Sequence, residues 1–208
     1  LMKRRLQGYT GDCCGATFLL CELTFYLTAM ILLYDMEIIL IRHTSVDVPP
    51  GTCYGQTDVP LKPTFEEEAL ITKEKLKAYG HFDCVYTSPL SRCTRLAKFC
   101  GYPNANRDTR ILELNFGAWE MQNYDHITDP RLQEWFDDYL NIAATGGESF
   151  AMQYERVALF LEELRTKPFH KVAVFTHGGV LICAQIYAGL LKREDAFKHT
   201  TPYGGIIS

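Results

Sequence analysis

The stretch ILLYDMEIILIRHT, residues 31–44, decides the fold because a buried strand begins and ends within it. Its part EIILI, residues 37–41, is a short and mostly β-branched apolar run, which is typical of a strand covered on both faces. Arg42 and His43 follow directly. Asp35 and Met36 separate this strand from the apolar residues before it. We therefore treat the residues before Met36 and the residues from Met36 onward as two parts with different predicted structures.

From Met36 onward the chain alternates between predicted strands and predicted helices. We expect strands at residues 37–41, 83–87, 109–114 and 171–176, and the start of a last strand in PYGGIIS, residues 202–208. Helices are expected at residues 65–79, 90–100 and 131–141, around residues 154–164, and from residue 178 to about 190. Strands that alternate with helices of this length need crossover connections, so the pattern predicts an α/β fold with a largely parallel sheet.

Residues 1–35 do not match the rest. Three cations at residues 3–5 precede an apolar run from Ala16 to Tyr34 that only Glu22 interrupts, a pattern of signal or anchor segments. The sequence GYTGDCCGAT, residues 8–17, and the apolar stretch after it resemble the C-terminal end of cobalamin synthase. Three interpretations remain open: a fragment of a neighbouring membrane enzyme or a mis-set start, a genuine membrane anchor at residues 16–34, and an ordered soluble helix.

The composition excludes some classes of function. The net charge of −4, without a basic stripe, argues against nucleic-acid binding. The eight cysteines form no C-x-x-C pair and no Cys/His spacing typical of zinc sites. A scattered pattern in a chain of 208 residues indicates reduced cysteines, so we expect a cytoplasmic protein with no structural metal.

Polar side chains follow several predicted strands at the point where each ends. Arg42 and His43 follow the first, Arg92 lies just after the second, Glu113 ends the third, and His177 follows the fourth. Each alone is as well explained by a surface or structural role. Ligands of open parallel sheets bind outside the carboxyl ends of the strands, so their joint placement predicts one site.

These residue types suit phosphoryl transfer. Two guanidinium groups can hold phosphate oxygens with charge-assisted hydrogen bonds, and a neutral imidazole can attack phosphorus. A carboxyl group can give a proton to the leaving oxygen and then act as a base toward water. Backbone N–H groups at Gly178 and Gly179, where a helix begins, can add donors for an anion. No metal or cofactor is needed for this chemistry.

Four motifs occur in order: LIRHT (40–44), TSPLSRCTRLA (87–97), ELNFGAWE (113–120) and FTHGG (175–179). Together they resemble the histidine phosphatase superfamily, in its phosphoglycerate-mutase-like branch, from Met36 almost to the end of the chain. The resemblance implies a three-layer sandwich, a mostly parallel sheet flanked by helices, for residues 36–208. It also implies a small phosphorylated substrate and leaves a homodimer possible.

The resemblance implies a role for each motif residue. His43 matches the nucleophile that becomes phosphorylated on its distal ring nitrogen, and Glu113 matches the proton donor. Arg42 and Arg92 match the phosphate-binding arginines, and His177 matches the second histidine, which contacts the phosphoryl group. Thr44 stands where glycine is more usual.

Within the superfamily, RHTSVDVPPGTCYGQTDVPL, residues 42–61, is most similar to α-ribazole phosphatases. This implies hydrolysis of α-ribazole 5'-phosphate in the assembly of the cobalamin nucleotide loop. Tyr54 and Gln56 are then candidates for substrate contact, or pack locally. Glu148, in GGES, belongs to a family-like motif or only favours the next helix start. A phosphoglycerate mutase, a broad sugar-phosphate phosphatase, and a phosphate-binding protein without activity remain as alternatives.

Overall fold

The structure is a computed structural model that describes residues 11–32, 36–198 and 200–208. The chain forms two compact units, Leu1–Met36 and Glu37–Ser208. The first contains the helix α2 (Gly11–Leu32), on which apolar side chains such as Phe18 and Leu23 are exposed. Among the described residues, no helix is long and apolar enough to cross a membrane. The predicted boundary after residue 35 stays a proposal.

The second unit is built on a five-stranded sheet in the order β3-β2-β4-β1-β5. The strands are β1 (Glu37–Arg42), β2 (Cys84–Thr87), β3 (Asn106–Arg107), β4 (Lys171–Thr176) and β5 (Ile206–Ile207). The first four pair in parallel, and β5 runs antiparallel to β1. The predicted strand at the end of the chain is therefore confirmed, and so is the mostly parallel sheet.

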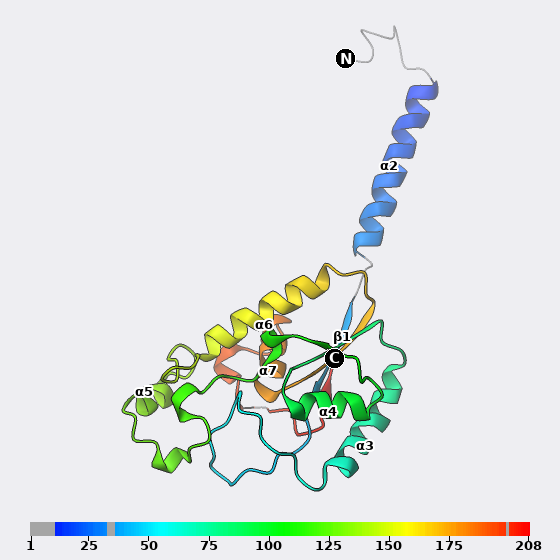
Figure 1. The fold of residues 1–208 in the computed structure, drawn as a ribbon. Helices are drawn as coiled ribbons and strands as arrows, with labels where there is room; N and C mark the ends of the chain where they lie inside the picture. Colours follow the sequence, from blue (N-terminus) through cyan, green and yellow to red (C-terminus); the bar gives the residue numbers. More distant parts are fainter. Residues whose placement is uncertain (1–10, 33–35, 199) are drawn as a thin grey trace. The chain divides into compact units, whose positions relative to one another are not determined.

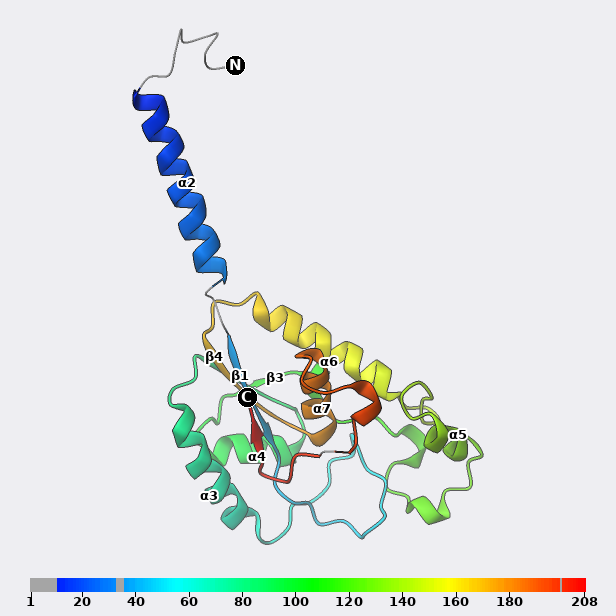
Figure 2. The same ribbon diagram turned by 180° about the vertical axis from the view of Figure 1, so that it is seen from behind.

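Helices cover both faces of the sheet. These helices are α3 (Phe65–Leu76), α4 (Ser91–Phe99), α6 (Phe150–Arg165) and α7 (Gly178–Tyr187). The short helix α5 (Arg131–Asp137) lies away from the sheet and packs through Leu132 against Trp119 (Figure 1). Short 3-10 helices lie at Lys77–Tyr79, Thr109–Ile111, Gly117–Trp119, Tyr124–His126 and, after α7, Arg193–Asp195. Figure 1 shows α6 and α7 on one side of the sheet and α3 and α4 on the other, and Figure 2 shows the same layers from behind. The three-layer prediction is confirmed.

Alternation along the strands explains the layers. Ile39 and Ile41 of β1 and Phe175 of β4 are fully buried in one cluster with α3 and α4 residues, including Leu96. Successive side chains of a strand point to opposite faces, so Leu40 and its neighbours in β4 face the other layer. Both faces of the central strands are thus covered, as the continuous apolar run EIILI predicted.

The predicted third strand at residues 109–114 is wrong. Strand β3 lies earlier, at Asn106–Arg107, and a 3-10 helix occupies Thr109–Ile111. The cause is Asp108, whose carboxylate accepts a hydrogen bond from the backbone N–H of Arg110 and pairs with its guanidinium at 2.6 Å. This local cap favours a helical turn over an extended strand. Glu113 therefore follows a turn, not a strand.

Two predicted helices are shorter than expected. The helix expected at residues 131–141 ends at Asp137, because Asp138 leaves the helical region and its carboxylate binds Asn141 locally. The last helix, expected to reach about residue 190, ends at Tyr187. Gly189 then adopts a positive φ of 72°, the left-handed conformation that commonly terminates a helix.

We propose that residues 36–208 fold without residues 1–35. The sheet's first inter-strand hydrogen bond begins at Glu37, whose N–H donates to His170 at 2.8 Å, and the core begins at Ile39. A chain that starts at Met36 should keep the thermal unfolding midpoint of the full chain. In the same shortened chain, Ile39→Ala should cost about 2–5 kcal/mol in urea unfolding, which shows that the assay detects damage. Failure of the unmodified short chain to fold would refute the boundary.

Candidate active site

Parallel pairing of β1 with β4 brings two histidines together. Arg42 lies opposite Thr176 in this register, so the residues that follow, His43 and His177, leave the sheet side by side. The backbone N–H of His43 donates to Thr176 at 3.0 Å, and the two imidazole ring centres lie 5.3 Å apart. The strand ends therefore deliver both rings to one place.

His43 is buried and neutral. Its Nδ1 lies 2.7 Å from the carbonyl oxygen of Thr44, so Nδ1 carries the hydrogen and Nε2 keeps a lone pair. Burial lowers the pKa of His43 to about 3, aided by the positive charge of Arg92 and opposed by the Thr44 hydrogen bond. An uncharged imidazole with its lone pair on the distal nitrogen can act as a nucleophile.

His177 is fully buried and has a defined tautomer. Arg92 donates from Nε to His177 Nδ1 at 3.3 Å, so that nitrogen accepts and Nε2–H donates to Ser88 Oγ at 2.7 Å. Burial and then Arg92 hold the pKa of His177 well below its usual value. The Arg92 guanidinium also donates to the carbonyl oxygens of Thr57 and Gly55.

Arg42 keeps a hydrogen-bond donor unused. Its Nη1 donates to the carbonyl oxygen of Thr201, and its guanidinium stacks on the ring of Tyr203 with 4.1 Å between Cζ and the ring centre. Its Nε is buried and has no partner in the described part of the chain. A Cβ on Gly178 would lie 3.2 Å from Cζ of Arg42, so glycine leaves room for this cation. Such a donor fits an anionic ligand.

Glu113 reaches the start of α7. Its Oε1 accepts hydrogen bonds from the backbone N–H of Leu114 and from Nε2 of Gln153, both at 3.0 Å. Its Oε2 accepts a longer one, 3.3 Å, from the N–H of Gly179. A Cβ on Gly179 would lie 2.4 Å from Oε1, so only glycine permits this approach.

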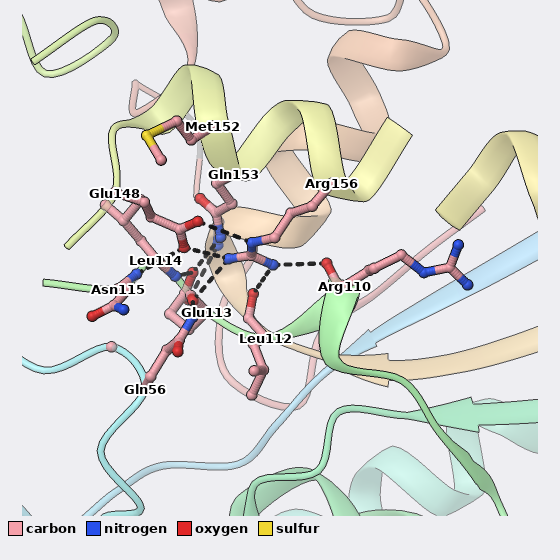
Figure 3. Close-up of polar contacts among 12 residues, drawn as sticks. Gln56, Arg110, Leu112, Glu113, Leu114, Asn115, Glu148, Met152, Gln153 and Arg156 are labelled. Atoms are coloured by element: carbon pink, nitrogen blue, oxygen red, sulfur yellow. Dashed lines mark hydrogen bonds and ion pairs between the residues drawn. The ribbon is translucent and has the colours of Figure 1, made fainter. Parts of the chain in front are cut away.

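A partly buried network that sequence reasoning missed holds the Glu113 segment (Figure 3). Arg156 of α6 donates to the carbonyl oxygens of Arg110 and Leu112 at 2.7 Å and of Glu113 at 2.9 Å. Its guanidinium also pairs with Glu148 at 2.6 Å, and Glu148 accepts from the N–H of Asn115. Glu148 therefore does more than favour a helix start. The sequence feature that could have predicted this network is the pair of polar residues, Gln153 and Arg156, beside the apolar face of α6.

The other predicted residues divide between the site and its surroundings. Tyr54 lines the cavity described below, and its hydroxyl lies 2.9 Å from that of Tyr203. Gln56 instead donates from Nε2 to the carbonyl oxygen of Glu113 at 3.1 Å, which is local support. Thr44 is buried, and its Oγ1 has no partner among the described residues.

A cavity of about 430 Å³ is lined by predicted site residues from separate segments of the chain, among them Arg42, His43 and Glu113. Its polar lining includes Arg42, His43, Glu113, Gln153, Gly178 and Gly179. Four further lining residues form what we call the aromatic wall: Phe116, Trp135, Tyr139 and Phe197. Successive rings of this wall contact one another, with centres 5.8, 6.2 and 5.0 Å apart. Arg92 and His177 are not among the described residues that line this cavity.

Comparison with known proteins assigns residues 38–206 to one family. The family model of the histidine phosphatase superfamily, branch 1, matches residues 38–206. A phosphoserine phosphatase of Hydrogenobacter thermophilus is 28% identical over 75% of this chain and 76% of its own. A probable phosphoglycerate mutase of Escherichia coli is also 28% identical, over 71% of this chain and 72% of its own.

A solved structure supports the fold. A putative α-ribazole-5'-P phosphatase of Escherichia coli superposes with a TM-score of 0.73. It is 24% identical, over 82% of this chain and 87% of that one. The family match begins at residue 38, so the similarity of residues 1–34 to cobalamin synthase stays a prediction.

The two neutral histidines should make stability depend on pH. Each binds a proton in the unfolded chain below its ordinary pKa of 6.5 but not when folded, so stability falls as pH falls through that value. His43 alone should cost about 1 kcal/mol between pH 7 and pH 5.5. Urea unfolding at both values should show a smaller difference for His43→Asn. An unchanged pH dependence in that variant would refute a neutral buried His43.

Proposed function

The chain belongs to the histidine phosphatase superfamily, and we propose that it hydrolyses α-ribazole 5'-phosphate through a phosphohistidine. The observation that carries this proposal is the cavity, which joins a site for a phosphate group to an aromatic wall. The superfamily membership covers phosphatases and mutases. The choice of substrate within it is our inference from the lining of the cavity and from the motifs.

In the first step, the lone pair on Nε2 of His43 attacks phosphorus, and the ester P–O bond breaks. Glu113 gives its proton to the leaving alcohol oxygen and becomes a carboxylate. In the second step, Glu113 takes a proton from water, the water oxygen bonds to phosphorus, and the N–P bond to His43 breaks. Inorganic phosphate leaves, and both residues return to their starting states.

Positive charge and N–H donors stabilise the transferred group. The unused Nε of Arg42 supplies a charge-assisted hydrogen bond to a phosphate oxygen. Arg92, held beside His177 and close to His43, adds positive potential at the site although its N–H groups donate to His177, Thr57 and Gly55. Because these groups are fixed by burial and by backbone contacts, they need little reorganisation during the reaction.

The aromatic wall favours a substrate with a flat apolar ring. Side chains such as Trp135 and Phe197 gain dispersion and ring-stacking energy from an aromatic group but little from a small charged one. α-Ribazole carries a benzimidazole, whereas phosphoserine and phosphoglycerate carry only short polar groups. The volume of about 430 Å³ also lies in the range of pockets that enclose a ligand larger than these.

Steady-state assays should rank the substrates. We expect kcat/KM for α-ribazole 5'-phosphate to exceed that for phosphoserine and 3-phosphoglycerate at least about tenfold, which is about 1.4 kcal/mol. Phe197→Leu removes one ring of the aromatic wall. It should lower kcat/KM for α-ribazole 5'-phosphate about two- to tenfold and leave kcat/KM for phosphoserine unchanged. His43→Ala is the control for contaminating phosphatases.

Higher kcat/KM for phosphoserine or a sugar phosphate would place the enzyme elsewhere in the superfamily. Exchange of phosphate between phosphoglycerate isomers, dependent on 2,3-bisphosphoglycerate, would identify a mutase. If none of these esters forms a phosphoenzyme, the remaining hypothesis is a phosphate-binding protein without catalytic activity.

Glu113→Gln should separate proton donation from phosphate binding. Without a transferable proton, kcat/KM for an alkyl phosphate should fall about 100-fold or more, because general acid catalysis contributes that much. The fall should be smallest for p-nitrophenyl phosphate, whose leaving group needs little protonation. Equal losses on both esters would contradict a role as general acid.

A further inference from the structure

Gln153 of α6 is the side chain that holds the Glu113 carboxylate from the helix side (Figure 3). It is fully buried, and it lines the same cavity as Glu113. Its Nε2–H donates to Oε1 of Glu113 at 3.0 Å. If the Gln153 amide were flipped, its oxygen would face Oε1 of Glu113 and the two oxygens would repel. Glu113 therefore determines the orientation of the Gln153 amide.

The other end of the amide has no partner. Oε1 of Gln153 is buried and accepts no hydrogen bond from any described residue. An unsatisfied buried acceptor costs about 1–3 kcal/mol of stability. A residue that lowers stability in this way beside reactive groups is expected to be kept for function.

The hydrogen bonds on Glu113 are unequally shared between its oxygens. Oε1 accepts two at 3.0 Å, from Leu114 and Gln153, whereas Oε2 accepts one at 3.3 Å from Gly179. Two donors on one oxygen disfavour a proton there, because the proton would compete with them for its lone pairs. Oε2 is therefore the oxygen that carries the proton in the acid form.

We propose that Gln153 is a positioning residue that fixes Oε1 of Glu113 as the unprotonated oxygen and so presents the proton on Oε2 to the leaving group. The proposal rests on the role of Glu113 as proton donor. After transfer, the same N–H donors receive the new carboxylate. Gln153 then stabilises the charge that the reaction creates on Glu113, without touching the transferred phosphoryl group.

Other charged and titratable groups face Glu113 from several elements, and a neutral substitution at Gln153 leaves them all in place. Arg42 and His43 at the end of β1 line the same cavity as Glu113, Cys93 of α4 and Cys183 of α7 are electrostatic neighbours of Glu113, and Arg156 of α6, paired with Glu148, binds its carbonyl oxygen. A change in pH dependence in a Gln153 variant therefore reports the lost N–H donor.

The test is Gln153→Met, which keeps the shape and removes both amide atoms. We expect an equal or higher thermal midpoint, because the unsatisfied oxygen is gone. For an alkyl phosphate, kcat/KM should fall about tenfold or more, with a smaller loss for p-nitrophenyl phosphate. The alkaline limb of the kcat/KM profile should move to higher pH, because the lost N–H donor binds the charged carboxylate more strongly than the neutral acid form. Met152→Leu, a half-exposed neighbour on α6, should change none of these.

A double variant shows through which residue Gln153 acts. In a Glu113→Gln background, Gln153→Met should add little further loss, because there is no proton left to position. Equal losses on both esters, an unmoved alkaline limb, or additive losses in the double variant would overturn the proposal. Glu113→Gln with full activity would instead overturn the proposed function itself, so the two failures are distinguishable.

Discussion

Parallel pairing of β1 with β4 is the constraint on which the rest of the site depends. These central strands are covered on both faces, so their ends cannot shift without moving the whole core. The register that sets Arg42 opposite Thr176 also sets His43 beside His177. The distance between the two rings is thus fixed by sheet hydrogen bonds and not by the histidines themselves.

Burial gives these side chains their chemistry. Burial lowers the pKa of both His43 and His177, and the nearby positive charge of Arg92 lowers it further. Arg42 keeps an unpartnered donor there as well. An unpartnered buried donor lowers the stability of the fold, and an anion that enters the site is bound by positive potential already in place. In the proposed mechanism, the affinity for phosphate and the reactivity of a neutral His43 therefore have one cause.

The parts of the structure that short patterns determine were predictable. Local apolar patterns predicted the strands EIILI and KVAVFT and the helices around them. The polar residues that follow these strands could be read directly from the sequence. The strand expected at 109–114 was not found, because one capping side chain, Asp108, outweighs a weak strand preference. The contacts of Arg156 and Glu148 with residues 110–115 join segments distant in sequence, and so does the aromatic wall. No local pattern encodes those contacts. Gln153 could have been suspected as a polar side chain on a buried helix face.

Catalysis and substrate choice share one segment of backbone. Glu113, the proposed proton donor, and Phe116, one ring of the aromatic wall, lie three residues apart on one segment of backbone. Arg156 fixes that segment through carbonyl oxygens on both sides of Leu112, and Glu148 fixes it through Asn115. In the proposed mechanism, a substrate ring that packs against Phe116 is therefore held at a fixed position relative to Glu113, because both residues belong to the same backbone segment. The free energy of ring binding can in this way help align the ester oxygen with the proton on Oε2, which turns binding of a remote group into rate.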